Sequence, residues 1–158
     1  MEPFLRGFRK RGRAVITKGE QQTFALGGKF AAGITAGEKT ALIGGLGAGK
    51  TCFIKGAVKG LGAGDSEACS PTFAIVREYK GPGPVIYHFD FYRLKDFAEL
   101  ENIGYRDYLN DGCSVIFAEW ADNIPETSRD FSRAVVISPA GKNSRRVEFY
   151  EKKVKNRC

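Results

Sequence analysis

The residues best suited to chemistry form a short glycine-rich stretch with the pattern G-x-x-x-x-G-K-[ST], made of Gly44, Gly45, Leu46, Gly47, Ala48, Gly49, Lys50 and Thr51. In such a stretch the glycines let consecutive backbone N–H groups turn toward an anion, the lysine adds a charge at the outer phosphates, and the threonine hydroxyl can bind Mg²⁺. An apolar run at 40–43 precedes the stretch, and residues 52–62 have the apolar stripe of a helix. Strand, loop and helix therefore follow in the order that a nucleoside-triphosphate site requires.

Two acidic residues, Asp90 and Glu119, each follow an apolar run that is typical of a buried strand. A magnesium nucleotide needs a carboxylate at the end of a neighbouring strand, which holds the metal and orients the attacking water. Many strands end in a solvated acid, so neither residue indicates a site by itself. Because the sequence also contains a phosphate loop, we predict that Asp90 and Glu119 are the acidic partners of the nucleotide. His88, the single histidine, is expected to be a packed, hydrogen-bonded strand residue.

The nucleotide base leaves a weaker signal. A guanine-specific site normally has an N/T-K-x-D pattern after the phosphate loop, and this sequence has none there. ATP is therefore the predicted nucleotide. Arg129 and Arg133, four residues apart, resemble the arginine lid of a small-molecule kinase, although an exposed charged segment is the simpler interpretation.

The elements around the loop predict the fold. A strand is expected to start at Val15, and residues 17–20 have the T-x-x-E pattern of a capping box, which predicts a helix through about Ala32. Two strand-like runs, 73–79 and 85–92, are separated by glycines and prolines and predict a hairpin, and residues 133–150 predict a second one. We therefore predict an α/β, three-layer P-loop NTPase fold with a mixed, partly antiparallel central sheet.

Length and composition favour one domain. With 158 residues and 42% hydrophobic content, a single P-loop domain is expected to span 1–158, with its core at about 14–150. No apolar stretch approaches the roughly eighteen residues of a membrane span, and residues 1–13 lack the apolar centre of a secretory signal. We expect a cytoplasmic protein that does not enter a membrane.

The net charge of +7 lies at the two ends of the sequence. Residues 1–13 carry five basic side chains and one acidic one, residues 142–158 carry seven and two, and the residues between them sum to −2. We expect basic extensions at 1–13 and 151–158. These ends either contact nucleic-acid phosphates or are solvated tails that aid solubility.

Several blocks of the sequence, in order and spacing, resemble the bacterial TsaE (YjeE) family of small ATPases, which support the synthesis of threonylcarbamoyladenosine in tRNA. The resemblance runs through about residues 17–120, and the S-P-T, H-F-D-x-Y-R-L and E-W blocks are specific to the family. The matching stretches are Thr23 with Leu26-Gly27, Leu46-Gly47-Ala48-Gly49-Lys50-Thr51, Ser70-Pro71-Thr72-Phe73, Tyr87-His88-Phe89-Asp90-Phe91-Tyr92-Arg93-Leu94, Glu99-Leu100-Glu101-Asn102-Ile103-Gly104 and Glu119-Trp120.

The resemblance implies a Mg²⁺-dependent ATPase in which Thr51 and Glu119 bind the metal, Lys50 contacts the phosphates and Asp90 organises water. It also implies that residues 45–52 surround the phosphates, that the segment from Thr17 to Thr23 lies near the base, and that Ser70-Pro71-Thr72 acts as a switch near the γ-phosphate. Its implied partners are the TsaD and TsaB proteins, with tRNA reached through them and direct contact by the basic ends as a further possibility. The ATPase is expected to be weak alone.

The sequence departs from the family at three positions. Gly45 stands where the family usually has an acid, Cys52 where it has a second threonine, and Ala121 where it has proline. The missing acid removes a charge beside the phosphates. We expect this loss to affect ATP hydrolysis or coupling to partners, whereas ATP binding should be retained. A small-molecule kinase and an assembly factor that binds ATP without turnover remain as alternatives.

Overall fold

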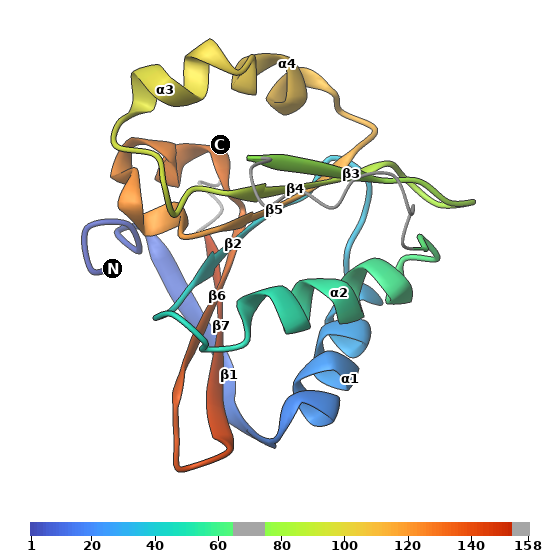
Figure 1. Ribbon diagram of the computed structural model, residues 1–158, viewed down its shortest axis with the longest axis vertical. Helices are drawn as coiled ribbons and strands as arrows, with labels where there is room; N and C mark the ends of the chain where they lie inside the picture. Colours follow the sequence, from blue (N-terminus) through green and yellow to red (C-terminus); the bar gives the residue numbers. More distant parts are fainter. Residues whose placement is uncertain (65–74, 153–158) are drawn as a thin grey trace, which may run out of the picture.

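The fold is built on one mixed sheet of seven strands in the order β1-β7-β6-β2-β5-β4-β3 (Figure 1). The computed structural model describes residues 1–64 and 75–152. The four central strands β6, β2, β5 and β4 are parallel, and the outer pairs β1–β7, β7–β6 and β3–β4 are antiparallel. The strands are β1 (Phe8–Lys18), β2 (Lys39–Ile43), β3 (Val76–Tyr79), β4 (Ile86–Asp90), β5 (Val115–Glu119), β6 (Arg133–Pro139) and β7 (Ser144–Lys152).

Helices cover both faces of the sheet, so the predicted three-layer α/β architecture is confirmed. Helices α1 (Glu20–Ala31) and α2 (Lys50–Gly60) pack on one face, and α3 (Phe97–Asn102) and α4 (Tyr105–Asn110) cover the other (Figure 1). Two short 3₁₀ helices, η1 (Ala121–Asn123) and η2 (Pro125–Asp130), connect β5 to β6. Each face has its own hydrophobic cluster, as expected for a sheet whose central strands are buried on both sides.

Parallel pairing brings the ends of three strands to one edge of the sheet. Strands β2 and β5 are almost entirely buried, and in the pairing Glu119 lies opposite both Leu42 of β2 and Asp90 of β4. The turn after β2 leads directly into α2, whose amino end lies at the same edge (Figure 1). The chemistry-bearing residues therefore meet here because the strands run in the same direction.

Glycines allow α1 and α2 to pack backbone to backbone. A Cβ atom added at Gly56 would lie 1.9 Å from the carbonyl oxygen of Phe24, and one at Gly27 would lie 2.0 Å from that of Phe53. No side chain fits at such distances, so the two glycines set the spacing of the helices. This packing holds α2, and with it the phosphate loop, against the sheet.

We expect Gly56→Ala to destabilise the protein because the added methyl group collides with rigid helix backbone. Forced overpacking costs about 1–3 kcal/mol, and a chain of this size loses about 2–4 °C in Tm per kcal/mol. Gly28→Ala is the matched control, since its Cβ would lie 3.5 Å from the nearest atom, an ordinary contact. Thermal melts that give the two variants the same Tm would contradict this account of the packing.

Two sequence-based expectations about the amino-terminal region are wrong. Strand β1 begins at Phe8 rather than Val15, and Phe4 is fully buried, so the core reaches well before residue 14 and residues 1–13 are not a tail. The capping box does not form, because Thr17 is the buried penultimate residue of β1 and the N-cap of α1 is Gly19. The helix itself spans nearly the predicted residues.

Both predicted hairpins agree with the structure, although residues 73 and 74 of the first run lie outside the described residues. The run at 85–92 contains β4, which pairs antiparallel with β3, and β6 and β7 form the closing hairpin. At the carboxyl end, residues 151 and 152 complete β7 rather than starting an extension, and residues 153–158 lie outside the described part of the chain.

Candidate nucleotide site

The loop between β2 and α2 has a backbone that requires its glycines. Gly47 and Gly49 have φ values of 70° and 102°, in the left-handed region that favours glycine. A Cβ at Gly44 would lie 2.3 Å from the carbonyl oxygen of Ile137 in β6. Leu46 at the tip is 82% exposed, whereas Ala48 is buried. The glycine spacing seen in the sequence thus reflects both the turn and its close approach to the next strand.

Lys50, the first residue of α2, is buried beneath this loop. Its Nζ donates hydrogen bonds to the carbonyl oxygens of Gly44 and Gly45, at 2.7 and 2.8 Å, and lies 3.9 Å from the ring centroid of Trp120. Burial lowers the pKa of Lys50, and the nearby carboxylates of Glu119, Asp90 and Asp122 oppose that shift. The ammonium is therefore held at the loop by backbone carbonyls, an aromatic face and surrounding acids.

Glu119 is the centre of the acidic part of the site. It is 5% exposed, and its Oε1 accepts hydrogen bonds from Thr51 Oγ1 at 2.6 Å and from His88 Nε2 at 2.9 Å. Burial raises the pKa of this carboxyl, but the bonds from His88 and Thr51 and the charge of Lys50 outweigh it and hold the pKa below its usual value. Because an ionised carboxylate can only accept hydrogen bonds, Nε2 of His88 carries the proton of this contact.

His88 confirms the expectation of a packed, hydrogen-bonded strand residue, but its partner gives it a role that the sequence did not indicate. It is 5% exposed, stacks on Tyr79 with ring centroids 6.3 Å apart, and directs Nε2 at the carboxylate. The ring therefore fixes the orientation of Glu119 from behind, as a positioning residue for the acid.

We expect His88→Phe to raise the pKa of Glu119, because the variant keeps a ring against Tyr79 but removes a donor to the ionised carboxylate. The stabilisation that ionised Glu119 contributes is present above the carboxyl's unfolded-state pKa and is lost as pH falls through its depressed folded-state value. In the variant this stabilisation is therefore smaller, and its loss is complete at a higher pH. Carbon-13 titration of the carboxyl would measure the shift. Tyr79→Phe is the control, and an unchanged midpoint in His88→Phe would refute the role.

Asp90 lies at the same edge, in a more open position. It is the last residue of β4 and is exposed, and its Oδ1 accepts a hydrogen bond from the backbone N–H of Tyr92 at 3.0 Å. It lies beside Glu119 in the parallel pairing and contributes to the charge around Lys50. The structure thus brings together Asp90 and Glu119, from two strand ends, and Lys50 and Thr51, from the start of α2.

Thr17 and Cys52 reach the loop only indirectly. The Thr17 hydroxyl is hydrogen-bonded to that of Thr23 at 2.8 Å, and the Thr23 methyl group faces Gly49. Cys52 Sγ donates to the carbonyl oxygen of Glu20 at 3.3 Å, toward the start of α1, and burial raises its thiol pKa. Both residues border the outer side of the amino end of α2. The Ser70-Pro71-Thr72 block lies outside the described residues.

Arg145 of β7 is a loop contact that sequence reasoning missed. Its Nε donates to the carbonyl oxygen of Ala48 at 3.0 Å, and its side chain covers Gly49, where an added Cβ would lie 2.8 Å from Nε. The residue lies about a hundred positions from the loop in sequence, so only the register of β7 reveals the contact. It places a second cation beside the phosphate loop.

Trp120, the second residue of the E-W block, also lies at the site. It is the one non-glycine residue with positive φ, 56°, within residues 1–64 and 75–152. This strained backbone turns the chain sharply after Glu119 and lets the indole contact both Lys50 and Tyr92, whose ring centroid is 4.9 Å away. The E-W pair therefore supplies an acid and the aromatic cover of the lysine.

The residues present fit a magnesium ion beside a phosphate group. The Thr51 hydroxyl and the Glu119 carboxylate are already in contact, and a loop threonine with a strand-end carboxylate is the oxygen pair that holds Mg²⁺ in P-loop proteins. Within the described residues, no group of three or more His, Cys, Asp or Glu forms a metal cluster. An ion here would thus rely on these two side chains and on the phosphates themselves.

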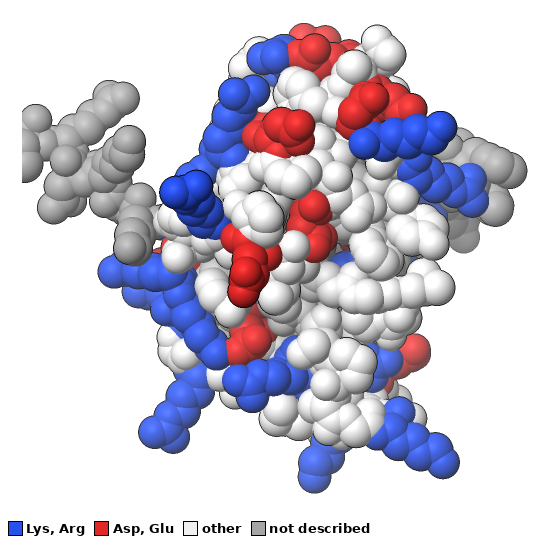
Figure 2. All heavy atoms as spheres, turned by 90° about the vertical axis from the view of Figure 1, so that its left-hand side faces the viewer, with Lys and Arg blue, Asp and Glu red and all other residues white. Residues whose placement is uncertain are grey.

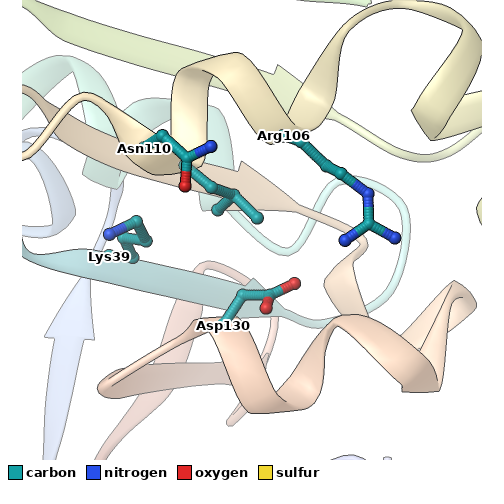
Figure 3. A pocket seen from close by; sticks show the side chains of 5 residues that line it. Lys39, Arg106, Asn110 and Asp130 are labelled. Atoms are coloured by element: carbon teal, nitrogen blue, oxygen red, sulfur yellow. The ribbon is translucent and has the colours of Figure 1, made fainter.

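A hollow of about 320 Å³ lies at the end of the parallel strands opposite the phosphate loop (Figure 3). Arg106 of α4 and Asp130 of η2 point into it beside Lys39, which begins β2. Asp130 Oδ2 is buried without a hydrogen-bond partner among the described residues, and burial raises the pKa of its carboxyl. Because Lys39 and Ile43 mark opposite ends of β2, this hollow is separate from the phosphate loop.

Comparison with known proteins identifies the family. The family described as threonylcarbamoyl adenosine biosynthesis protein TsaE matches residues 17–147. The chain belongs to the TsaE family. Its members take part in tRNA threonylcarbamoyladenosine biosynthesis, so the resemblance carried by the E-W, H-F-D and phosphate-loop blocks is confirmed.

Individual TsaE proteins show how far the similarity extends. The Bacillus subtilis protein is 38% identical over 84% of this chain and 82% of its own length, and the Aquifex aeolicus protein is 31% identical over 89% and 97%. The Haemophilus influenzae protein is 47% identical over 51% of this chain, but that match spans only 50% of its length. A crystal structure of Bacillus subtilis YdiB superimposes with a TM-score of 0.69 and 28% identity, over 91% of this chain and 88% of that one. The likeness agrees with the predicted P-loop fold.

Among the described residues, no helix is both long and apolar enough to cross a membrane.

Proposed function

We propose that this TsaE protein binds and hydrolyses Mg²⁺-ATP and thereby supports threonylcarbamoyladenosine modification of tRNA, acting on TsaD and TsaB. The observation that carries the proposal is the contact between Thr51 and Glu119 next to Lys50, at the end of a glycine loop. An anion-binding loop, a buried cation and an ionised acid within one cluster are the parts that phosphoryl transfer needs.

Each residue has a distinct task in this proposal. The backbone N–H groups of the loop and the amino end of α2 bind the phosphates, and Lys50 supplies the charge at the outer ones. Thr51 and Glu119 would hold Mg²⁺, which when bound neutralises phosphate charge and orients the γ-phosphate. Asp90, open to solvent at the neighbouring strand end, orients the attacking water.

His88 and Arg145 act on this machinery from outside. His88 keeps Glu119 oriented and ionised, and Arg145 fixes the Ala48–Gly49 turn while adding a cation beside it. Thr17, Thr23 and Cys52 line the side of α2 toward which the base would extend. Gly45 has open space around its Cβ position, so loss of the family's acid there leaves room beside the phosphates rather than a distorted loop.

The kinase alternative loses its main support. Arg133 pairs with Glu38 at 2.9 Å; Arg133 begins β6 and Glu38 immediately precedes β2, so the pair lies opposite the phosphate loop. An arginine engaged there is badly placed to close over a γ-phosphate. An assembly factor would use the same binding site as an ATPase. The two functions differ only in whether Asp90 and Glu119 promote hydrolysis of the bound ATP.

Product analysis distinguishes the three functions. The purified protein is incubated with Mg²⁺-ATP, with and without TsaD and TsaB, and released phosphate is measured. We expect inorganic phosphate and ADP, with faster release when the partners are present. A phosphorylated small molecule would indicate a kinase, and tight ATP binding with no release under either condition would indicate an assembly factor.

A further inference from the structure

Strands β1 and β7 bring the two basic ends of the sequence onto one ribbon. Residues 8–18 and 144–152 pair antiparallel, with Phe8 opposite Lys152 and Lys18 opposite Ser144. The ribbon carries eight Lys and Arg side chains and two Glu, a net of +6, whereas the whole chain is +7. Nearly all the excess charge of the protein therefore lies on these two strands.

Only part of that charge is neutralised within the fold. Lys10 and Arg146 share Glu148, and Arg11 pairs with Glu151 at 3.1 Å. Arg9, Arg13 and Lys18 are exposed and form no ion pair within the described residues. Unpaired cations repel one another along a strand, so an external polyanion would be attracted to the ribbon and would relieve that repulsion.

The ribbon is open to a large partner. Strand β1 is the outermost strand of the sheet, so its free edge faces solvent. In Figure 2, Lys and Arg line one side and the lower end of the face that includes the ends of β2, β4 and β5, whereas Asp and Glu gather at its top and centre. The lower end is formed by the tip of the β6–β7 hairpin and the end of β1 (Figure 1).

We propose that the β1–β7 ribbon binds RNA through its phosphate backbone and that, given the proposed function, the RNA is tRNA. The ribbon's exposed apolar side chains are Val15 and Ile16, at 37% and 49%, which is little for the core of a protein interface. Interfaces with nucleic acids are much more positively charged, and the planar guanidinium groups of Arg9 and Arg13 suit bidentate contacts to phosphate.

The geometry adds a functional consequence. The carboxyl end of β1, at Lys18, leads directly into α1 beside the phosphate loop, and Arg145 of β7 donates a hydrogen bond to Ala48 in that loop. RNA on the ribbon would thus lie on an element that contacts the nucleotide site.

The test is the salt dependence of tRNA binding by the full-length protein. Arg9→Gln/Arg13→Gln is compared with Lys59→Gln/Lys95→Gln, which removes the same charge from α2 and the segment before α3. We expect the ribbon variant to bind an unmodified tRNA transcript at least tenfold more weakly at low salt. The slope of log affinity against log salt should become shallower by about 1.4–1.8, because each lost phosphate contact removes about 0.7–0.9. The control should keep the parental slope.

Equal slopes for the ribbon variant and the parental protein would overturn the proposal. Displacement of the tRNA by polyglutamate at equal charge concentration would also overturn it, in favour of an acidic protein as the partner. ATP hydrolysis is measured on the same samples and should be unchanged in both variants. If the parental protein lacked ATPase activity, the proposed function would fail while the salt slopes would still decide whether the ribbon binds RNA.

Discussion

Glu119→Gln is expected to lower ATP turnover by about 10²–10³-fold, the loss typical of removing one electrostatic contact to a transition state. The amide keeps the size of the side chain and can still accept hydrogen bonds from Thr51 and His88, so the fold should be retained. What it loses is the negative charge that the structure maintains by holding the pKa of the carboxyl low. Asp90→Asn should also reduce turnover, with no effect on stability because Asp90 is exposed.

Glu38→Gln provides the control for both variants. Glu38 pairs with Arg133 at the opposite end of the parallel strands, so the Glu38→Gln variant loses a charge and an ion pair without changing the nucleotide site. Phosphate release is measured with the partner proteins present, and thermal melts check folding. Parental turnover in both Glu119→Gln and Asp90→Asn would show that the acidic cluster has no part in hydrolysis and would favour a protein that binds ATP without cleaving it.

The sequence could predict the site to the extent that its parts are local or follow from strand direction. The phosphate loop is contiguous, and its glycines are required by backbone angles that a spacing pattern records directly. Asp90 and Glu119 could be added because parallel strands place their carboxyl ends at one edge. These two arguments account for the cluster around Lys50.

The contacts that the sequence did not reveal all depend on pairing between distant segments. His88 lies two residues from Asp90 on the same face of β4, yet its partner is Glu119 of β5, which lies diagonally across from it in the parallel pairing. Arg145 reaches the loop through the register of β7, which no local pattern specifies. Such contacts become visible only after the whole sheet is assembled.

Strand β1 shows how composition can hide an element. Its first half is rich in arginine and contains Gly12, a composition with little tendency to form a strand. The pairing with β7 and the burial of Phe4 against Phe131 stabilise it instead, with ring centroids 6.0 Å apart. A segment that looks like a solvated tail in the sequence thus completes the sheet.

The Thr17–Glu20 pattern failed as a capping box for a related reason. Thr17 is part of β1, and its hydroxyl is hydrogen-bonded to the hydroxyl of Thr23 rather than to a backbone N–H at the start of α1. The helix begins at nearly the predicted residue because Gly19, with φ of 86°, makes the sharp turn from strand to helix. The T-x-x-E pattern thus predicted the start of α1 nearly correctly, although Gly19, and not a threonine cap, is what starts the helix.

Lys50→Met is expected to weaken Mg²⁺-ATP binding by about ten- to a hundredfold. A hydrogen bond to a charged group contributes about 1.5–3 kcal/mol, and 1.4 kcal/mol corresponds to a factor of ten in affinity. Methionine can occupy the apolar space beside Trp120, so the change isolates the ammonium group, which burial and two loop carbonyls now hold at the site. Calorimetric titration with Mg²⁺-ATP measures the difference.

Lys59→Met, at the exposed far end of α2, removes the same charge from the same helix and should bind ATP with the parental affinity. A melt of each variant separates loss of binding from loss of folding. Because the proposed role places the ammonium at the outer phosphates, Lys50→Met should weaken ATP binding more than AMP binding. A folded Lys50→Met protein with unchanged ATP affinity would mean that the loop does not bind the phosphates as proposed, whatever the role of Glu119.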